Sequence, residues 1–173
     1  MHDEEIRYRL IDGPQTEVSV RVAAPASVLW PYVCDINFSA RFSPEFQGAE
    51  WLDGATGPAL GARFRGTNEH PVAGRWQVDC VITELEPGRC IGWDVIGPDG
   101  AAASWRFTLD DADGDENGTI VTEWCRLGPG PSGLTPAIQR MPDREHDIIA
   151  RRLAEHRGNM AANLAGLVEL AGD

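Results

Sequence analysis

Much of the chain alternates between apolar and polar positions with the period of two that is typical of β-strands. The alternation is clean over residues 16–23, where three valines occupy every second position. Further strands are predicted downstream, separated by turns rich in Gly, Pro and Asp; they cover residues 49–52, 62–70, 75–85, 90–96, 102–109 and 119–127. The connections between these strands are too short for crossover helices, so we expect an antiparallel sheet.

The segments that flank these strands carry helix and turn signals. Residues 6–10 also alternate, and they either extend the first strand backwards or form a short hairpin around residues 12–14. Two short helices are predicted after the first strand, over residues 25–33 and 35–41, because a proline and an aspartate stand at their starts. Residues 128–133 are rich in Gly and Pro and form a break before the C-terminal region.

The last 30 or so residues change to the helical period of 3.6. A helix of roughly 29 residues, about 43 Å long, is predicted over residues 142–170. Its apolar stripe consists of Ile149, Leu153, His156, Met160, Leu164 and Leu167. Because a single helix with one apolar face must pack on a sheet, we expect one α+β domain over residues 1–173.

The charge of the chain narrows the choice of partners. Asp and Glu outnumber Lys and Arg by 27 to 15, so the formal net charge is −12. Such a surface argues against a nucleic-acid partner and against docking on anionic lipids. No apolar run approaches the roughly 20 residues of a membrane span. Residues 1–5 are acidic, unlike a secretory signal, so we expect a cytoplasmic protein with no membrane insertion, either a monomer or a homodimer.

The sequence contains few signals of metal, cofactor or covalent chemistry. The four cysteines form no CxxC pair, and no histidine stands at zinc-finger spacing. We therefore expect reduced cysteines that behave as small apolar residues. No nucleophile triad and no phosphate-binding loop is present. The sequence accordingly assigns no catalytic residue, no metal site and no cofactor.

Several stretches, in this order and at this spacing, resemble one known superfamily. They are VRVAAPASVLW at 20–30, GARFRGTN at 61–68, ITELEPGR at 82–89 and SWRFTL at 104–109, followed by GTIVTEW at 118–124. Together with the C-terminal helix they resemble the START-related helix-grip proteins, in the SRPBCC branch of polyketide cyclase/dehydrase and lipid-transport-like proteins. The resemblance implies a curved antiparallel sheet of about six to seven strands, wrapped around the long C-terminal helix with a cavity between them.

The resemblance implies that this cavity binds a hydrophobic small molecule, either a lipid, a polyketide-like compound or an aromatic compound. Large aromatic side chains on the strands can line such a cavity. The candidate ligand-contacting residues are Phe64, Asn68, Trp76, Trp93, Trp105, Phe107, Trp124, Leu153, His156 and Met160. His156 is the sharpest polar candidate because it lies on the apolar stripe of the helix, where it can hydrogen-bond a ligand carbonyl or transfer a proton.

An enzyme is the alternative: a polyketide aromatase/cyclase or dehydratase that uses polar residues of the cavity. Asn68 stands where the resemblance implies a basic residue, which weakens this alternative. His156 and Glu123 are the other polar candidates. Both faces of strand 119–127 are mixed, so Glu123 either points inward with a raised pKa or is buried in a pair with an arginine such as Arg106. A regulatory protein with a vestigial cavity is a third possibility.

Overall fold

A computed structural model describes residues 6–172 of the chain. Residues 1–5, whose acidic character argued against a secretory signal, lie outside the described residues, as does residue 173. Within residues 6–172, seven strands form one antiparallel sheet in the order β1-β7-β6-β5-β4-β3-β2. The strands are β1 (Gln15–Val22), β2 (Phe46–Trp51), β3 (Arg63–His70), β4 (Gly74–Glu86), β5 (Cys90–Gly97), β6 (Gly100–Ala112) and β7 (Asp115–Leu127).

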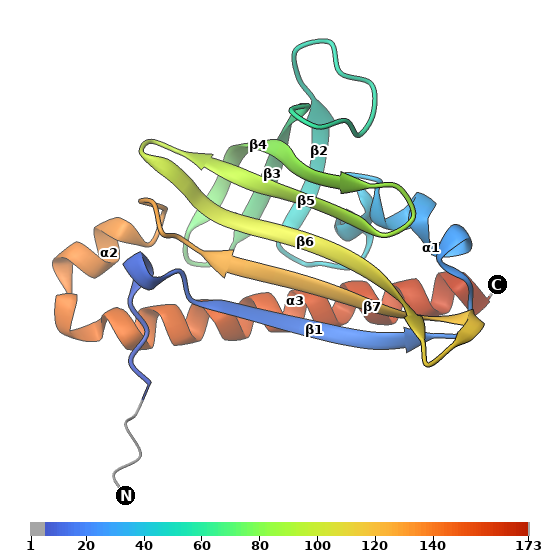
Figure 1. The fold of residues 1–173 in the computed structure, drawn as a ribbon. Coiled ribbons are helices and arrows are strands. Elements are labelled where there is room, and N and C mark those ends of the chain that lie inside the picture. Colours follow the sequence, from blue (N-terminus) through green and yellow to red (C-terminus); the bar gives the residue numbers. More distant parts are fainter. Residues whose placement is uncertain (1–5, 173) are drawn as a thin grey trace, which may run out of the picture.

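One long helix dominates the other layer of the fold. Figure 1 shows α3 (Glu145–Gly172) running along the sheet beside β1 and β7. The shorter helical segments are η1 (Leu10–Asp12), α1 (Ala26–Val33), η2 (Phe38–Arg41), α2 (Thr135–Arg140) and η3 (Pro142–Arg144). This curved sheet around a C-terminal helix confirms the predicted helix-grip fold.

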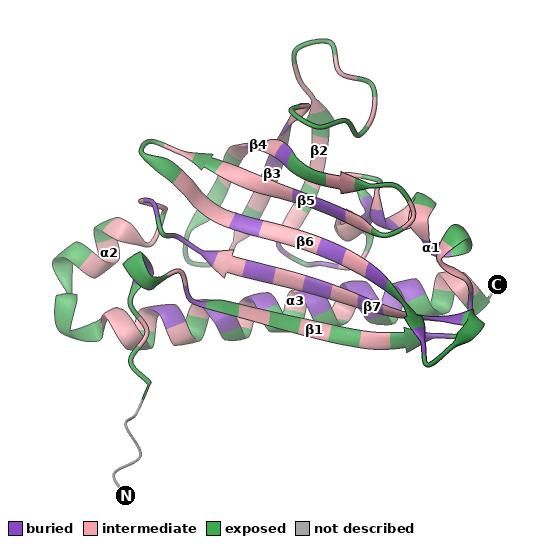
Figure 2. Cartoon of the chain, in the orientation of Figure 1, coloured by how far each residue is buried: buried purple, intermediate pink, exposed green. Residues whose placement is uncertain are grey.

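Alternation along the strands gives the sheet an inner face toward α3 and an outer face. On β7 the inward side chains Val121, Glu123 and Cys125 are buried, whereas Thr122 and Trp124 between them are half-buried. Figure 2 shows this alternation on β6 and β7, with a matching buried stripe along α3. All six residues predicted for the apolar stripe of the helix are buried. The core therefore lies between the inner face and α3.

The structure differs from the sequence prediction near the N-terminus. Residues 6–9 neither extend β1 nor form a hairpin, and Tyr8 packs on α3 instead. The Tyr8 ring stacks on His146 with centroids 5.1 Å apart, and the Tyr8 amide donates to His146 Nδ1 at 3.0 Å. The Leu10 amide donates to Glu145 Oε1 at 2.9 Å. These long-range contacts outweigh the local preference for an extended strand.

Two further elements depart from the prediction. Helix α2 was not predicted. The Gly- and Pro-rich segment before it masks the helical signal, although a proline is tolerated in the first turn of a helix. The β6–β7 hairpin is also tighter than the predicted loop over residues 110–118. Its turn is formed by Asp113 and Gly114, both with positive φ (48° and 75°), as tight hairpin turns require.

Contacts from the helical layer cover both edges of the sheet. At β1, Arg157 of α3 donates to the Glu17 carbonyl at 2.8 Å and to Thr16 Oγ1 at 3.0 Å. At β2, the Asn37 side chain exchanges two hydrogen bonds with the Ala49 backbone, at 2.8 and 3.1 Å. These contacts hold α3 and η2 against the sheet. No helix within residues 6–172 is long and apolar enough to cross a membrane.

Candidate functional site

A row of aromatic side chains crosses the inner face of the sheet. Phe64 on β3 contacts Trp93 on β5 edge-on, with ring centroids 5.9 Å apart. Trp93 in turn lies 6.3 Å from Phe107 on β6. Cross-strand pairing places Trp105 beside Trp93 on the same face. Four of the predicted ligand-contacting aromatic residues are thus brought together on one wall of the interior.

Helix α3 supplies the opposite wall. Leu153, His156 and Met160 are all buried there, as the helical stripe predicts. The His156 ring meets Trp105 edge-on, with centroids 4.8 Å apart and an interplanar angle of 85°. Burial, assisted by the nearby positive charge of Arg152, lowers the pKa of His156 to about 3. The imidazole is therefore neutral at physiological pH and can donate or accept one hydrogen bond at each nitrogen according to its tautomer.

Asn68 and Trp76 lie apart from this row. They form a cross-strand pair near the β3–β4 hairpin, with the parity of the inner face, and both are half-buried. Between them and the aromatic row, the Phe46 ring lies over Gly66, where an added Cβ would approach a ring carbon at 3.1 Å. The structure thus places these two predicted residues at one end of the interior, beside the β3–β4 hairpin.

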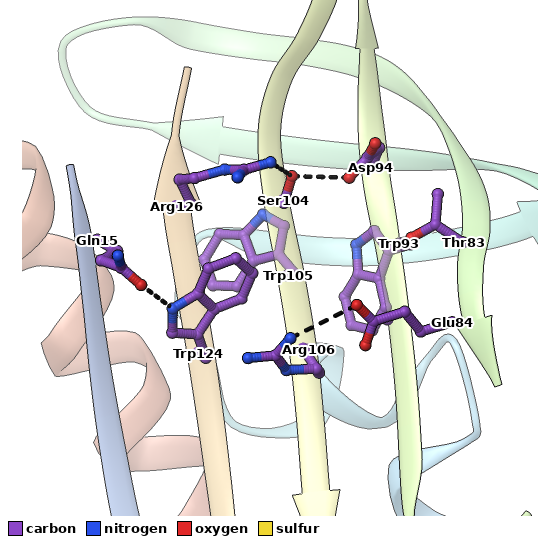
Figure 3. A pocket seen from close by; sticks show the side chains of 11 residues that line it. Gln15, Thr83, Glu84, Trp93, Asp94, Ser104, Trp105, Arg106, Trp124 and Arg126 are labelled. Carbon is purple, nitrogen blue, oxygen red and sulfur yellow. Dashed lines mark hydrogen bonds and ion pairs between the residues drawn. The ribbon is translucent and has the colours of Figure 1, made fainter. Parts of the chain in front are cut away.

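Trp124 was wrongly assigned to the interior, because it lies on the outer face. The register pairs Trp105 with Cys125, so Trp124 shares a face with Arg106 instead. Its ring is covered by the Arg106 guanidinium, 4.6 Å from the ring centroid, and its Nε1 donates to Gln15 Oε1 at 2.6 Å (Figure 3). The two faces of β7 are similarly mixed in polarity, so alternation alone could not assign them.

The outer face around Trp124 is hollowed. A depression of about 300 Å³ lies there, and the outer-face side chains around it are Gln15, Glu84, Asp94, Ser104, Arg106, Trp124 and Arg126 (Figure 3). Arg106 pairs there with Glu84 at 3.5 Å. Ser104 donates to Asp94 at 2.7 Å and accepts from Arg126 at 3.2 Å. A second outer hollow, of about 430 Å³, lies around the ion pair of Arg65 with Asp79. Arg126 differs from these pairs, because among residues 6–172 its side chain bonds to the neutral Ser104 hydroxyl and its buried Nε has no hydrogen-bond partner.

The interior itself is packed. The Phe38 ring meets Phe107 edge-on at 6.1 Å, and the Phe42 ring lies directly on the backbone of Gly166, where no larger residue fits. Met160 has no exposed surface. These side chains fill the interior around Phe107, Gly166 and Met160. A ligand held between the sheet and α3 must displace some of these side chains.

A polar cluster is embedded in this apolar interior, formed by Glu123, Asn163 and Ser39. Asn163 Nδ2 lies 3.2 Å from both carboxyl oxygens of Glu123 and 3.2 Å from Ser39 Oγ. Glu123 and Asn163 are each only 3% exposed. Burial raises the pKa of Glu123 to about 8, and the Asn163 hydrogen bond only partly offsets this effect.

This cluster answers the question that the sequence left open for Glu123. The carboxyl points inward, and its partner is the Asn163 amide rather than an arginine. Arg106 lies on the outer face, bound to Glu84. Sequence reasoning missed Asn163 because it lies beside the apolar stripe of α3 and reads as a polar surface position.

A second polar cluster joins α3 to the segment before β2. Arg152 donates to both carboxyl oxygens of Glu45 and, at 2.8 Å, to Glu155. Asn159 donates to Glu45 at 3.3 Å, and His70 lies 3.3 Å from Glu155. Although burial alone would raise the pKa of Glu45, hydrogen bonding and the charge of Arg152 lower it overall. The Arg152 side chain is only 17% exposed.

Comparison with known proteins places the chain in a family. A family model described as polyketide cyclase / dehydrase and lipid transport matches residues 14–170. The chain belongs to this polyketide cyclase/dehydrase and lipid-transport family. No match was found among curated proteins. Within residues 6–172, no three His, Cys, Asp or Glu side chains gather in a way that could hold a metal ion.

Solved structures of similar fold support this assignment. A polyketide-cyclase-like protein, Cgl2372 from Corynebacterium glutamicum, is 28% identical, with a TM-score of 0.59 and 87% of each chain covered. The Zhui aromatase/cyclase from Streptomyces sp. R1128 is 20% identical, with a TM-score of 0.64, and the match covers 92% of this chain and 93% of that one. TTHA0849 from Thermus thermophilus is 14% identical, with a TM-score of 0.60 and 91% and 97% covered. The last two likenesses show the fold alone.

Within this polyketide cyclase/dehydrase and lipid-transport fold, the interior combines one aromatic wall with two separate polar positions. His156 faces Trp105, and Asn163 holds Glu123 seven residues further along α3. Seven residues correspond to two helical turns, or about 10 Å along the axis. Such an arrangement can contact an elongated apolar molecule along its length and hydrogen-bond it at two points.

Proposed function

We propose that the protein binds an apolar small molecule, such as a lipid, a polyketide-like or an aromatic compound, between the inner face of the sheet and α3. The observation that carries the proposal is the continuous aromatic row of Phe64, Trp93 and Phe107, with Trp105 beside it, facing the neutral His156. Aromatic walls with a few placed polar groups are the usual lining of small-molecule sites. The family match supports the same conclusion.

Entry of a ligand requires side chains to move, and Met160 is suited to this. It lies on the inward stripe of α3 and is fully buried. Methionine has three rotatable bonds and a polarisable thioether, so it repacks at low cost compared with a branched side chain. A ligand that displaces Met160 contacts the indole of Trp105 and the imidazole of His156.

We also propose a location, an oligomeric state and a range of partners from the charge and composition of the chain. The protein acts in the cytoplasm as a monomer or homodimer, without a nucleic-acid partner or membrane insertion. The net charge of −12 supports this because it opposes association with phosphate backbones.

Binding is tested by native mass spectrometry after mild purification, combined with titrations of fatty acids and aromatic polyketides followed by tryptophan fluorescence. Trp105→Phe removes a reporter from the inner face, and Trp124→Phe is its matched control on the outer face. Ligand is expected to change the emission of the wild type and of Trp124→Phe by similar amounts. The change shrinks in Trp105→Phe. If no compound is retained and none alters the emission, the proposal fails.

A second candidate function is a polyketide cyclase or dehydratase. The observation that favours it is the pair of titratable groups in the interior, a neutral imidazole at His156 and a carboxyl at Glu123 that keeps its proton at neutral pH. The two groups lie too far apart to share one proton, but they can act at two positions of an extended poly-ketone. Turnover of a poly-β-keto thioester mimic tests this function. Unchanged turnover in His156→Ala removes its main support.

A further inference from the structure

The outer-face hollow around Trp124 contains two opposite charges that are joined only through a neutral hydroxyl. Arg126 on β7 donates from Nη2 to Ser104 Oγ at 3.2 Å, and Ser104 on β6 donates to Asp94 Oδ1 on β5 at 2.7 Å. The strand register places the three residues in one row across the sheet. Within residues 6–172, neither Arg126 nor Asp94 has a salt-bridge partner, so Ser104 separates an arginine and an aspartate that both lack a direct ion pair.

Both charged side chains can form more hydrogen bonds than they do. A guanidinium carries five N–H donors, and a carboxylate has about four acceptor sites. Arg126 donates to Ser104 alone, and its buried Nε meets no acceptor in the described part of the chain. Arg126 and Asp94 are half-buried and both line the hollow. A ligand in the hollow can therefore add an acceptor beside Arg126 and a donor beside Asp94.

A second row beside the first has the same direction of charge. The Arg106 guanidinium on β6 lies 4.6 Å from the centroid of the Trp124 ring and pairs with Glu84 on β4 at 3.5 Å. Figure 3 shows both arginines toward the Trp124 side of the hollow, whereas Asp94 and Glu84 lie toward the opposite side. The hollow is therefore positive toward β7 and negative toward β4 and β5.

Gly92 leaves the room between the two rows. It pairs with Arg106 on one neighbouring strand and with Glu84 on the other, and it has no side chain to fill the space between them. An added Cβ would lie 3.3 Å from both Glu84 Cβ and the Trp105 carbonyl oxygen. The volume of about 300 Å³ is at the lower end of the range for small-molecule pockets, so the hollow suits a small ligand.

We propose that this hollow is a second binding site, separate from the interior, and that it takes a free α-amino acid as its zwitterion. The ligand carboxylate accepts from the Arg126 guanidinium, and the ligand ammonium donates to the Asp94 carboxylate. In an α-amino acid the two charged groups are attached to one carbon, which matches two protein charges that flank a single hydroxyl. The ligand side chain lies over Gly92, between the two rows.

The same charges disfavour ligands that carry only one charge. A simple carboxylate can bond to Arg126, but it then lies beside the like charge of Asp94 without an ammonium group to offset it. A simple amine meets the reverse situation. Because each of these ligands loses one charge-assisted hydrogen bond, each should bind about tenfold more weakly than the zwitterion.

Three compounds with one skeleton test the proposal: L-phenylalanine, 3-phenylpropionate and 2-phenylethylamine. At about pH 6.5 they are a zwitterion, an anion and a cation. NMR titrations of the full-length protein give the three dissociation constants. The indole N–H signal of Trp124, identified by its loss in Trp124→Phe, shows whether the ligand occupies the hollow. Phenylalanine is expected to shift this signal and to bind about tenfold more tightly than either single-charge analogue.

Two variants separate the contributions of the two charges. Asp94→Asn should reduce the preference for phenylalanine over phenylpropionate to about twofold or less and leave the preference over phenylethylamine. Arg126→Gln should do the reverse. Glu69→Gln is the matched control, because Glu69 is an exposed carboxylate outside the hollow that pairs with Arg75 at 3.7 Å. It should keep both ratios.

The outcomes also separate this inference from the proposed function. If phenylalanine shifts no Trp124 signal, or binds no more tightly than its single-charge analogues, the zwitterion site is refuted. Ratios that stay unchanged in both Asp94→Asn and Arg126→Gln refute it as well. If phenylalanine shifts the indole signal of Trp105 and not that of Trp124, the ligand occupies the interior and the outer site is again refuted. Retention of fatty acids or polyketides in the interior is a separate result, since it does not involve Asp94 or Arg126.

Discussion

Glu123 makes the protein less stable as pH rises, and replacing it with Gln should remove this effect. The carboxyl is 3% exposed and is held by one amide, Asn163. Burial raises its pKa from the ordinary value of 4.5 to about 8. Between these values the folded protein keeps the Glu123 proton while the unfolded chain releases it. Because the folded pKa is the higher one, the favourable contribution is complete below about pH 4.5 and is lost as pH rises to about 8.

The size of the effect follows from the width of this window. Each pH unit inside it costs the folded state about 1.4 kcal/mol relative to the unfolded chain. By pH 7 the accumulated cost is about 3 kcal/mol, and it stops growing above about pH 8. Glutamine has nearly the shape of the protonated side chain but does not titrate. Glu123→Gln should therefore match the wild type near pH 4.5 and be more stable by about 3 kcal/mol at pH 7.

Urea unfolding followed by tryptophan fluorescence at several pH values between about 5 and 8 measures this difference. The difference between variant and wild type isolates Glu123, because every other group titrates in both proteins. Glu17→Gln, on the exposed outer face, should show a difference that stays small at every pH. A free-energy difference between Glu123→Gln and the wild type that does not change with pH would refute the burial of an uncompensated carboxyl.

Three further predictions concern the helix and its contacts. Arg152→Ala leaves Glu45 buried without its cation, so the free energy of unfolding should fall by about 3 kcal/mol. Equal stability of the variant and the wild type in urea would contradict the buried ion pair. Gly166→Ala places a methyl group against the Phe42 ring and should lower the free energy of unfolding by about 1–3 kcal/mol. Phe42→Ala in the same chain should restore part of this loss. If Gly166→Ala leaves the stability unchanged, the ring does not lie there. The pKa of His156 is lowered to about 3, so its imidazole NMR signals should stay constant from about pH 8 to 5. A titration midpoint near pH 6.5 would mean that the ring is solvated.

The fold could be predicted from the hydrophobic periodicity, because each period shows which face of a strand or helix must be buried. The period of two over residues 16–23 and the later strands requires a half-buried sheet, and β1 forms at Gln15–Val22. The 3.6 period of the last segment requires one buried helix face, and the predicted stripe, including His156, is buried as expected. Most strand boundaries deviate by only a few residues.

The candidate site could be predicted only in part, because several of its features depend on contacts between distant segments. Trp124 and Glu123 are neighbours on β7, and both faces of this strand carry polar and apolar side chains. The pairing of β7 with β6 therefore decided which of the two points inward. Arg152 reads as a surface residue until Glu45, more than one hundred positions earlier, is placed against it.

The sequence by itself thus determined the strands, their antiparallel sheet and the buried stripe of α3, since periodicity is a local property of the chain. Only the tertiary structure decided the buried polar cluster of Glu123, Asn163 and Ser39. Its three members come from β7, α3 and η2, and each is an ordinary polar residue in its own segment. These side chains lose their water only when β7, α3 and η2 pack against one another. The raised pKa of Glu123 follows from that burial.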